Sequence, residues 1–132
     1  MPCACGQQGC LAALVSRAGI LSLLGWPDDA TMRDVVGAAQ RGDQAVLRVL
    51  SACGEAVAAA CAPLVDLLGP DVVILAGPLF EVPRVLDVLA RELNHASFVG
   101  RLNGVRVLAA SLGRDVGLIG AASLVYDQLV TG

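Results

Sequence analysis

The sequence has few charged and few aromatic residues, and this scarcity limits what the chain can bind. Charged residues make up 16% and aromatic residues 3% of its 132 positions. Nine basic residues stand against twelve acidic ones, and they form no basic stripe. A nucleic-acid surface needs clustered Lys or Arg to neutralise phosphates. We therefore expect no nucleic acid to bind through this region.

Long uncharged apolar runs and a secretory leader are also missing. Charged residues break the longest apolar segments, at Arg17, Asp28, Glu55, Asp66 and Asp115. A membrane-spanning helix needs about 18 or more apolar residues, and a secretory signal combines basic residues with a cleavage site. We expect a cytoplasmic protein without membrane contact. Because 56% of the residues are hydrophobic, residues 1–132 are expected to form a single domain with a buried core.

The first part of the chain has apolar residues at helical spacing. Residues 11–24 are predicted to form one helix that ends at Gly25-Trp26-Pro27. A second, short helix would be capped by Asp28 or Asp29 and run to about Ala39.

The strongest periodic segment is a long helix that opens at Gly42-Asp43. Pro63 should kink this helix or interrupt its hydrogen bonding, and Gly69-Pro70 should stop it. Steps of three and four residues draw one apolar stripe along it. The stripe consists of Val46, Leu50, Cys53, Val57, Cys61, Leu64 and Leu68.

After Asp71 the pattern changes to alternating strands and helices. Val72–Leu75 is predicted to be a strand buried on both faces, and Pro83–Asn94 a helix. Val105–Leu108 would form a second strand and Gly113–Leu129 a final helix. A strand, a helix and a strand in this spacing predict a right-handed βαβ unit with a parallel pair.

Two strands are fewer than a parallel sheet needs, since the mean sheet has about five or six. The chain therefore resembles part of an α/β domain whose other strands lie elsewhere. At least one sheet edge and one sheet face would lack cover. We expect the chain to associate as a homodimer or larger species.

Three cysteines within the first ten residues concentrate the chemistry of the chain. Cys3, Cys5 and Cys10 are separated by glycines that let the backbone turn tightly. Such a thiol cluster suits a soft divalent metal, and this interpretation is favoured over chance clustering or redox-sensitive thiols. A tetrahedral structural site needs a fourth ligand. Since the number is odd and no secretory signal is evident, a disulfide is less expected.

The other candidate ligands favour structural roles. Cys53 and Cys61 lie on the apolar stripe of the long helix, where buried thiols pack as small hydrophobic groups. His95, the single histidine, lies in a polar stretch and is expected to be solvated.

The motif Cys-x-Cys-Gly-x-x-Gly-Cys-Leu at residues 3–11, followed by an apolar helix, resembles the zinc loop of the ROK family (repressor, open reading frame, sugar kinase). The resemblance continues through Gly42-Asp43, Val72–Gly77 and Leu118–Ala122 and covers essentially the whole chain. It implies an α/β, ribonuclease H-like fold of the actin-like ATPase type. This chain would be a partial domain: the helix-rich C-terminal half with its βαβ unit and C-terminal helix.

The resemblance also implies site residues. Cys3, Cys5 and Cys10 would bind zinc with a histidine from a Glu-x-Gly-His motif, which precedes Met1 and would leave the site incomplete. Ala76 and Gly77 match a turn that packs against adenosine in the family's kinases. Without the phosphate loop and the catalytic Asp, ATP binding is not expected, and a simple strand terminator is the favoured interpretation of this turn. Ala12 stands where those kinases have a sugar-contacting Glu.

We therefore expect the effector-sensing and dimerisation region of a ROK transcriptional regulator, not an enzyme by itself. A sugar or sugar-phosphate effector would bind only the full-length parent. The alternatives are a fragment of a sugar kinase and a stand-alone zinc-containing interaction domain.

Overall fold

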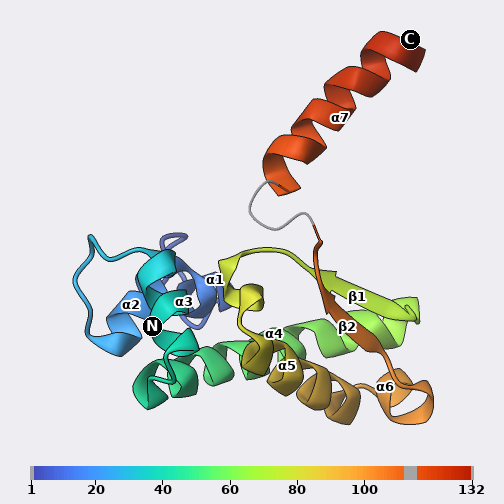
Figure 1. Ribbon diagram of the computed structural model, residues 1–132. Helices are drawn as coiled ribbons and strands as arrows, with labels where there is room; N and C mark the ends of the chain where they lie inside the picture. Colours follow the sequence, from blue (N-terminus) through green and yellow to red (C-terminus); the bar gives the residue numbers. More distant parts are fainter. Residues whose placement is uncertain (1, 112–115, 132) are drawn as a thin grey trace.

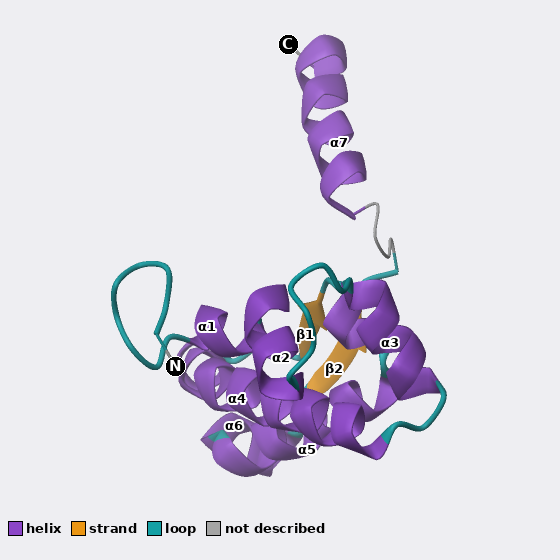
Figure 2. Ribbon diagram, turned by 90° about the vertical axis from the view of Figure 1, so that its left-hand side faces the viewer, coloured by secondary structure: helices purple, strands orange, loops and turns teal. Residues whose placement is uncertain are grey.

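The computed structural model describes residues 2–111 and 116–131 of the chain. In chain order they form α1 (Leu11–Val15), α2 (Arg17–Leu24), α3 (Met32–Gln40), α4 (Gln44–Leu68), β1 (Val72–Leu75), η1 (Pro78–Glu81), α5 (Pro83–Ala96), α6 (Phe98–Asn103), β2 (Arg106–Ala109) and α7 (Val116–Thr131). Figure 1 shows α4 and α5 running side by side, with the two strands near one end and α1–α3 near the other. In both ribbon views α7 projects away from this body (Figure 2).

The predicted βαβ unit is confirmed. β1 and β2 pair in parallel, with Val72 opposite Arg106 and Leu75 opposite Ala109. The connecting helix α5 begins at Pro83, as predicted, and runs two residues further than Asn94. The segment from residue 113 to 115 of the predicted final helix lies outside the described residues, and α7 begins at Val116.

The prediction that β1 is buried on both faces is wrong. Alternate side chains of a strand point to opposite faces. Val73 and Leu75 pack against the core together with Val107 of β2. Ile74 lies on the other face and is 65% exposed, and its register partner Leu108 is 47% exposed. The described residues therefore pack against only one face of the sheet.

The predicted single helix over residues 11–24 is divided in two. Ser16 has extended backbone angles and ends α1, and its hydroxyl oxygen accepts a hydrogen bond from the Gly19 N–H at the start of α2. A serine that satisfies the first N–H groups of a helix is a strong N-cap. This local cap replaces the continuous hydrogen bonding that apolar spacing alone suggests.

The cap of the next helix also differs from the prediction. α3 is capped by Thr31 and not by Asp28 or Asp29. The Thr31 hydroxyl accepts from the Asp34 N–H, and the Asp34 carboxylate accepts from the Thr31 N–H at 2.8 Å. Because this reciprocal capping box satisfies two donors at once, it fixes the helix start two or three residues later than predicted.

The long helix opens and closes where the sequence predicts. The Asp43 carboxylate accepts hydrogen bonds from the N–H groups of Ala45 and Val46, and Gly69 ends α4 in the left-handed region at φ 59°. Pro63 does not end the helix, which continues to Leu68. Pro63 is exposed, so its ring displaces no packed neighbour.

The apolar stripe of α4 changes partners along its length. Its first half packs with α1–α3, η1 and the start of α5, and its second half packs with the rest of α5 and the sheet. The buried residues therefore shift after Val57 to Ala58, Ala62 and Val65, whereas the predicted Leu64 and Leu68 are exposed.

By length and composition alone, α4 is long and apolar enough to cross a membrane. The sequence expectation concerned uncharged apolar runs, and Arg48, Glu55 and Asp66 do interrupt α4. Core helices have the same properties, and α4 contacts α1, α2, α3, α5 and α6. Its apolar residues form the core that these five helices cover.

Candidate metal centre

The segment before α1 folds back on itself as a tight loop. The Cys3 N–H donates to the Gln7 carbonyl, and the Gly6 N–H donates to the Cys3 carbonyl, both at 2.9 Å. Gly6 and Gly9 have φ values of +85° and +75°. These left-handed angles favour glycine, so the two glycines of the motif allow the turns that bring its cysteines together.

The loop gathers the three thiols that the sequence singles out. The Sγ atoms of Cys3, Cys5 and Cys10 all lie within 4.8 Å of one another. Those of Cys5 and Cys10 are 3.6 Å apart. In a tetrahedral zinc site with Zn–S bonds of about 2.3 Å, neighbouring sulfurs are about 3.8 Å apart. The spacing of the thiols therefore fits one face of such a site.

The three thiols influence one another's ionisation. Hydrogen bonds from the Gln7 backbone and then from the Cys3 and Cys10 thiols lower the pKa of Cys5. Hydrogen bonds with Cys5 and then with Cys3 raise the pKa of Cys10. The thiolate form of Cys5 is thus favoured, and that of Cys10 is disfavoured. A bound divalent cation would remove this conflict, because it stabilises several thiolates at once.

The loop is fixed to the body through α1. Cys10 is the N-cap of this helix, and its carbonyl accepts a hydrogen bond from the Ala13 N–H at 3.0 Å. Leu14 and Val15 pack against the core. At the crossing of α1 and α2, a Cβ added to Gly19 would lie 2.0 Å from the Ala13 carbonyl oxygen. This close approach requires glycine and sets the position of α1.

Ala12 lies in the first turn of α1 and is exposed. It lines a surface hollow of about 410 Å³ between the cysteine loop and α2. The other lining residues are small: Pro2, Cys3, Ala4, Ala13, Ser16, Ala18, Gly19 and Ser22. Among the described residues that line the hollow there is no carboxylate, so these residues offer no charged acceptor for a hydroxyl group.

Ala76 and Gly77 follow β1 and lead into η1. Gly77 has φ 123° and its carbonyl accepts a hydrogen bond from the Phe80 N–H at 3.0 Å. The turn borders a hollow of about 310 Å³ that Arg17 and Met32 also line. The structure therefore places this turn at a concave surface, away from the three cysteines.

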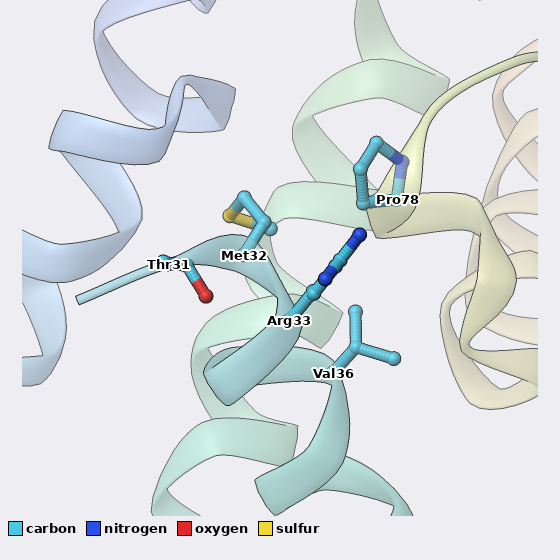
Figure 3. A pocket seen from close by; sticks show the side chains of 5 residues that line it. All are labelled: Thr31, Met32, Arg33, Val36 and Pro78. Carbon is cyan, nitrogen blue, oxygen red and sulfur yellow. The ribbon is translucent and has the colours of Figure 1, made fainter. Parts of the chain in front are cut away.

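A second hollow of about 310 Å³ adjoins it between α3 and η1. Figure 3 shows the Arg33 side chain extending from α3 toward Pro78 of η1. Sequence reasoning missed this hollow because it did not predict η1. The available signal was Pro78 directly after Gly77, since proline favours the first position of a helical turn.

The other candidate ligands lie elsewhere. Within the described part of the chain, Cys3, Cys5 and Cys10 form the one group of three or more side chains that could bind a metal together. Cys53 is buried, its Sγ atom lies 3.7 Å from the Leu14 carbonyl oxygen, and burial raises its pKa to about 11. Burial also raises the pKa of Cys61. His95 lies in the last turn of α5, where its carbonyl accepts from Arg101.

Comparisons with known proteins agree with the motif. The model of the ROK family matches residues 1–128. The glucokinase of Thermotoga maritima is 29% identical over 96% of this chain and 45% of its own length. The xylose repressor of Bacillus subtilis is 25% identical over 97% of this chain and 34% of its own length. The chain therefore spans about a third to just under half of these relatives.

Solved structures show the same fold. The ROK family glucokinase of Streptomyces griseus, in complex with glucose and AMPPNP, superposes with a TM-score of 0.75. It is 26% identical, and the match covers 94% of this chain and 46% of that one. The ROK hexokinase of Thermus thermophilus gives a TM-score of 0.71 at 25% identity over 100% of this chain and 45% of that one. The described elements thus form part of an actin-like ATPase fold.

Proposed function

Because the chain belongs to the ROK family, we propose that it is the effector-sensing and dimerisation region of a ROK transcriptional regulator. A structural zinc ion would be bound by Cys3, Cys5 and Cys10. The relatives include glucokinases and repressors, so similarity alone does not separate these two functions. The whole protein's activity and effector therefore belong to the proposal.

The observation that carries the regulator function is Ala12. By resemblance, this position holds a sugar-contacting Glu in the kinases, and here it places a methyl group in a hollow without a carboxylate. A hydrogen bond to a charged group contributes about 1.5–3 kcal/mol. Its loss would weaken sugar binding by about one to two orders of magnitude. A sensor tolerates such weakening better than a kinase, which must hold the sugar for phosphoryl transfer.

The role proposed for the metal is structural. Zinc bound to the thiols would fix the loop of residues 3–10 against α1, and through α1 against the core. The group contributes three side chains, and a structural zinc ion takes four ligands. The fourth would come from outside this group. A site of this kind should release zinc to a chelator more readily than a complete four-ligand site.

Elemental analysis tests the metal site. Protein purified without chelator should hold one zinc per chain, and the double variant Cys5→Ser/Cys10→Ser should hold none. Cys61→Ser is the matched control, since Cys61 lies outside the group, and it should keep its zinc. Equal zinc in the wild type and the double variant would place the metal elsewhere.

The second candidate function is a part of a sugar kinase. It is favoured by the TM-score of 0.75 to the glucose-bound glucokinase. A coupled ATP assay with glucose, fructose and N-acetylmannosamine tests whether this chain phosphorylates a sugar by itself. As a regulator region, the chain should match the blank without protein. Turnover that survives repurification and disappears when this chain is mutated would establish the kinase and refute the regulator.

Self-association is the remaining part of the proposal. The uncovered sheet face carries Ile74 and Leu108, and apolar surfaces of this kind recruit a second chain. Light scattering over a concentration series should show a dimer or larger species. A monomer at every concentration, with a cooperative melting transition, would mean that the chain needs no partner.

A further inference from the structure

The pair Cys5 and Cys10 has a property beyond metal binding. Their Sγ atoms are 3.6 Å apart. Cys5 is exposed and Cys10 partly exposed, so small oxidants in solution reach both. A disulfide bond is about 2.05 Å long, so the two sulfurs need to approach by about 1.5 Å.

We propose that Cys5 and Cys10 are a thiol oxidation site, at which a peroxide forms a reversible disulfide between them. The loop between the two residues permits this closure. Neither Gly6 nor Gly9 has a neighbouring atom within 4 Å of the position of an added Cβ. The space on that side of each glycine is therefore open, so no packed atom there opposes a tighter turn.

The reaction is a two-electron oxidation of the dithiol. The Cys5 thiol releases a proton, its thiolate attacks one oxygen of hydrogen peroxide, and the O–O bond breaks to give a sulfenic acid and hydroxide. The hydroxide takes up the released proton and leaves as water. The Cys10 thiolate then attacks the Cys5 sulfur, the S–O bond breaks, and a second water leaves after protonation. In sum, two thiols and one peroxide give one disulfide and two waters. A dithiol reductant reverses the reaction by thiol–disulfide exchange.

This chemistry competes with the metal, and that consequence rests on the proposed function. The disulfide removes two of the three thiolates and leaves Cys3 as the one ligand of the group. Zinc has no redox chemistry of its own, so it would leave as Zn²⁺ with its charge unchanged. Metal binding and disulfide formation at this loop are therefore mutually exclusive.

Oxidation of the cysteine loop would also change the surface beside it. Cys10 and Leu11 line a hollow of about 440 Å³ together with three alanines of α4, which are Ala56, Ala59 and Ala60. Since Cys10 is also the N-cap of α1, drawing its sulfur toward Cys5 changes the rim of this hollow. The exposed α4 surface would thus differ between the reduced and oxidised chain.

The chain contains its own control thiols. Cys53 is buried and Cys61 is partly buried on α4, and neither belongs to the cysteine group. Both should stay reduced at a peroxide concentration that oxidises the loop completely. Cys3→Ser supplies a further control, because it removes the third thiol and keeps the pair.

The experiment uses the full chain in two forms, metal-free and zinc-loaded, each treated with hydrogen peroxide. Free thiols are alkylated, and peptide mass spectrometry locates the linked pair by the loss of two hydrogens. The metal-free wild type and Cys3→Ser should both form the Cys5–Cys10 disulfide, and Cys5→Ser should not. In the zinc-loaded form, a chromogenic chelator should detect zinc release in proportion to disulfide, and dithiothreitol should restore zinc binding.

Several outcomes would overturn the inference: a disulfide mainly through Cys3, sulfinic acid without disulfide, or equal oxidation of Cys53 and Cys61. Disulfide formation without zinc release would refute the competition between the two. A protein that forms the disulfide when metal-free but never binds zinc would support the oxidation site and refute the proposed metal site. Failure of one proposal is thus distinguishable from failure of the other.

Discussion

Replacing Gly19 with alanine tests whether the contact between α1 and α2 holds the cysteine loop in place. An added Cβ would lie 2.0 Å from the Ala13 carbonyl oxygen and 3.0 Å from that of Leu14. Both atoms belong to the backbone of α1, so relief requires movement of the helix and not of a flexible side chain. Since Cys10 caps α1, the movement would also disturb the cysteine loop.

The expected cost follows from two opposing effects. Overpacking a tight site costs about 1–3 kcal/mol, whereas alanine in place of glycine in a helix contributes about 1 kcal/mol of stability. At a distance of 2.0 Å the steric effect should prevail. We expect Gly19→Ala to lower the free energy of unfolding by up to about 2 kcal/mol, which is the balance of the two effects, and to weaken zinc binding.

Gly37→Ala is the matched control. Its added Cβ would meet only the Arg41 guanidinium, at 3.3 Å, and this end of a flexible side chain can move. The control should therefore be as stable as the wild type, or up to about 1 kcal/mol more stable. Urea denaturation followed by far-UV circular dichroism measures both variants. Equal stability of Gly19→Ala and Gly37→Ala would refute the close approach of α1 and α2.

Three further variants test the contacts that hold the elements together. Hydrogen bonds from the Ser97 hydroxyl and then the Val99 N–H lower the pKa of Asp66 from its ordinary value. This stabilisation is complete above the unfolded-state pKa and disappears as the pH falls through the folded-state pKa. Asp66→Asn should therefore be less stable than the wild type at neutral pH, and the difference in melting temperature should vanish in acid. Asn94→Ala removes three hydrogen bonds of 2.7 to 3.0 Å, two of them to the Val105 backbone, and should cost about 1–3 kcal/mol in denaturant titrations. Thr31→Ala removes the capping box of α3 and should cost about 1 kcal/mol in the same titrations; an unchanged midpoint for either would contradict the contact.

Elements with strong local signals were predictable from the sequence. Asp43 and Gly69 mark the ends of α4 because a carboxylate satisfies the free N–H groups and glycine adopts the left-handed terminating conformation. The βαβ unit was predictable because β-branched residues favour a strand over Val72–Leu75 and proline favours a helix start at Pro83. Glycines between the cysteines predict a loop that turns tightly, and the structure brings the three thiols together.

Features that depend on tertiary contacts were not predictable in this way. Nothing in the apolar spacing of residues 11–24 shows that the chain turns at Ser16 to place α1 across α2. Helix α6 was missed although Ser97 is a local N-cap, whose hydroxyl oxygen accepts a hydrogen bond from the Gly100 N–H, because further support for its first turn comes from far away in the sequence. The Asp66 carboxylate of α4 accepts hydrogen bonds from the Ser97 hydroxyl at 2.6 Å and from the Val99 N–H at 3.0 Å. A short helix stabilised by such a distant partner has no periodic signal of its own.

The uncovered sheet face explains both the error about β1 and the expected strength of self-association. Four consecutive apolar residues are typical of a strand covered on both faces, but the described residues cover only the face of Val73 and Leu75. Ile74 and Leu108 stay 65% and 47% exposed. Full burial of such a side chain contributes about 1.5–3 kcal/mol. Burying the exposed part of Ile74 would therefore add about 1–2 kcal/mol, and that of Leu108 about 0.7–1.4 kcal/mol. Association itself costs about 4 kcal/mol or more, so this pair alone cannot hold a dimer. The exposed apolar residues of α7, Val125 and Val130 among them, would have to contribute as well, and the association should be weak and dependent on concentration.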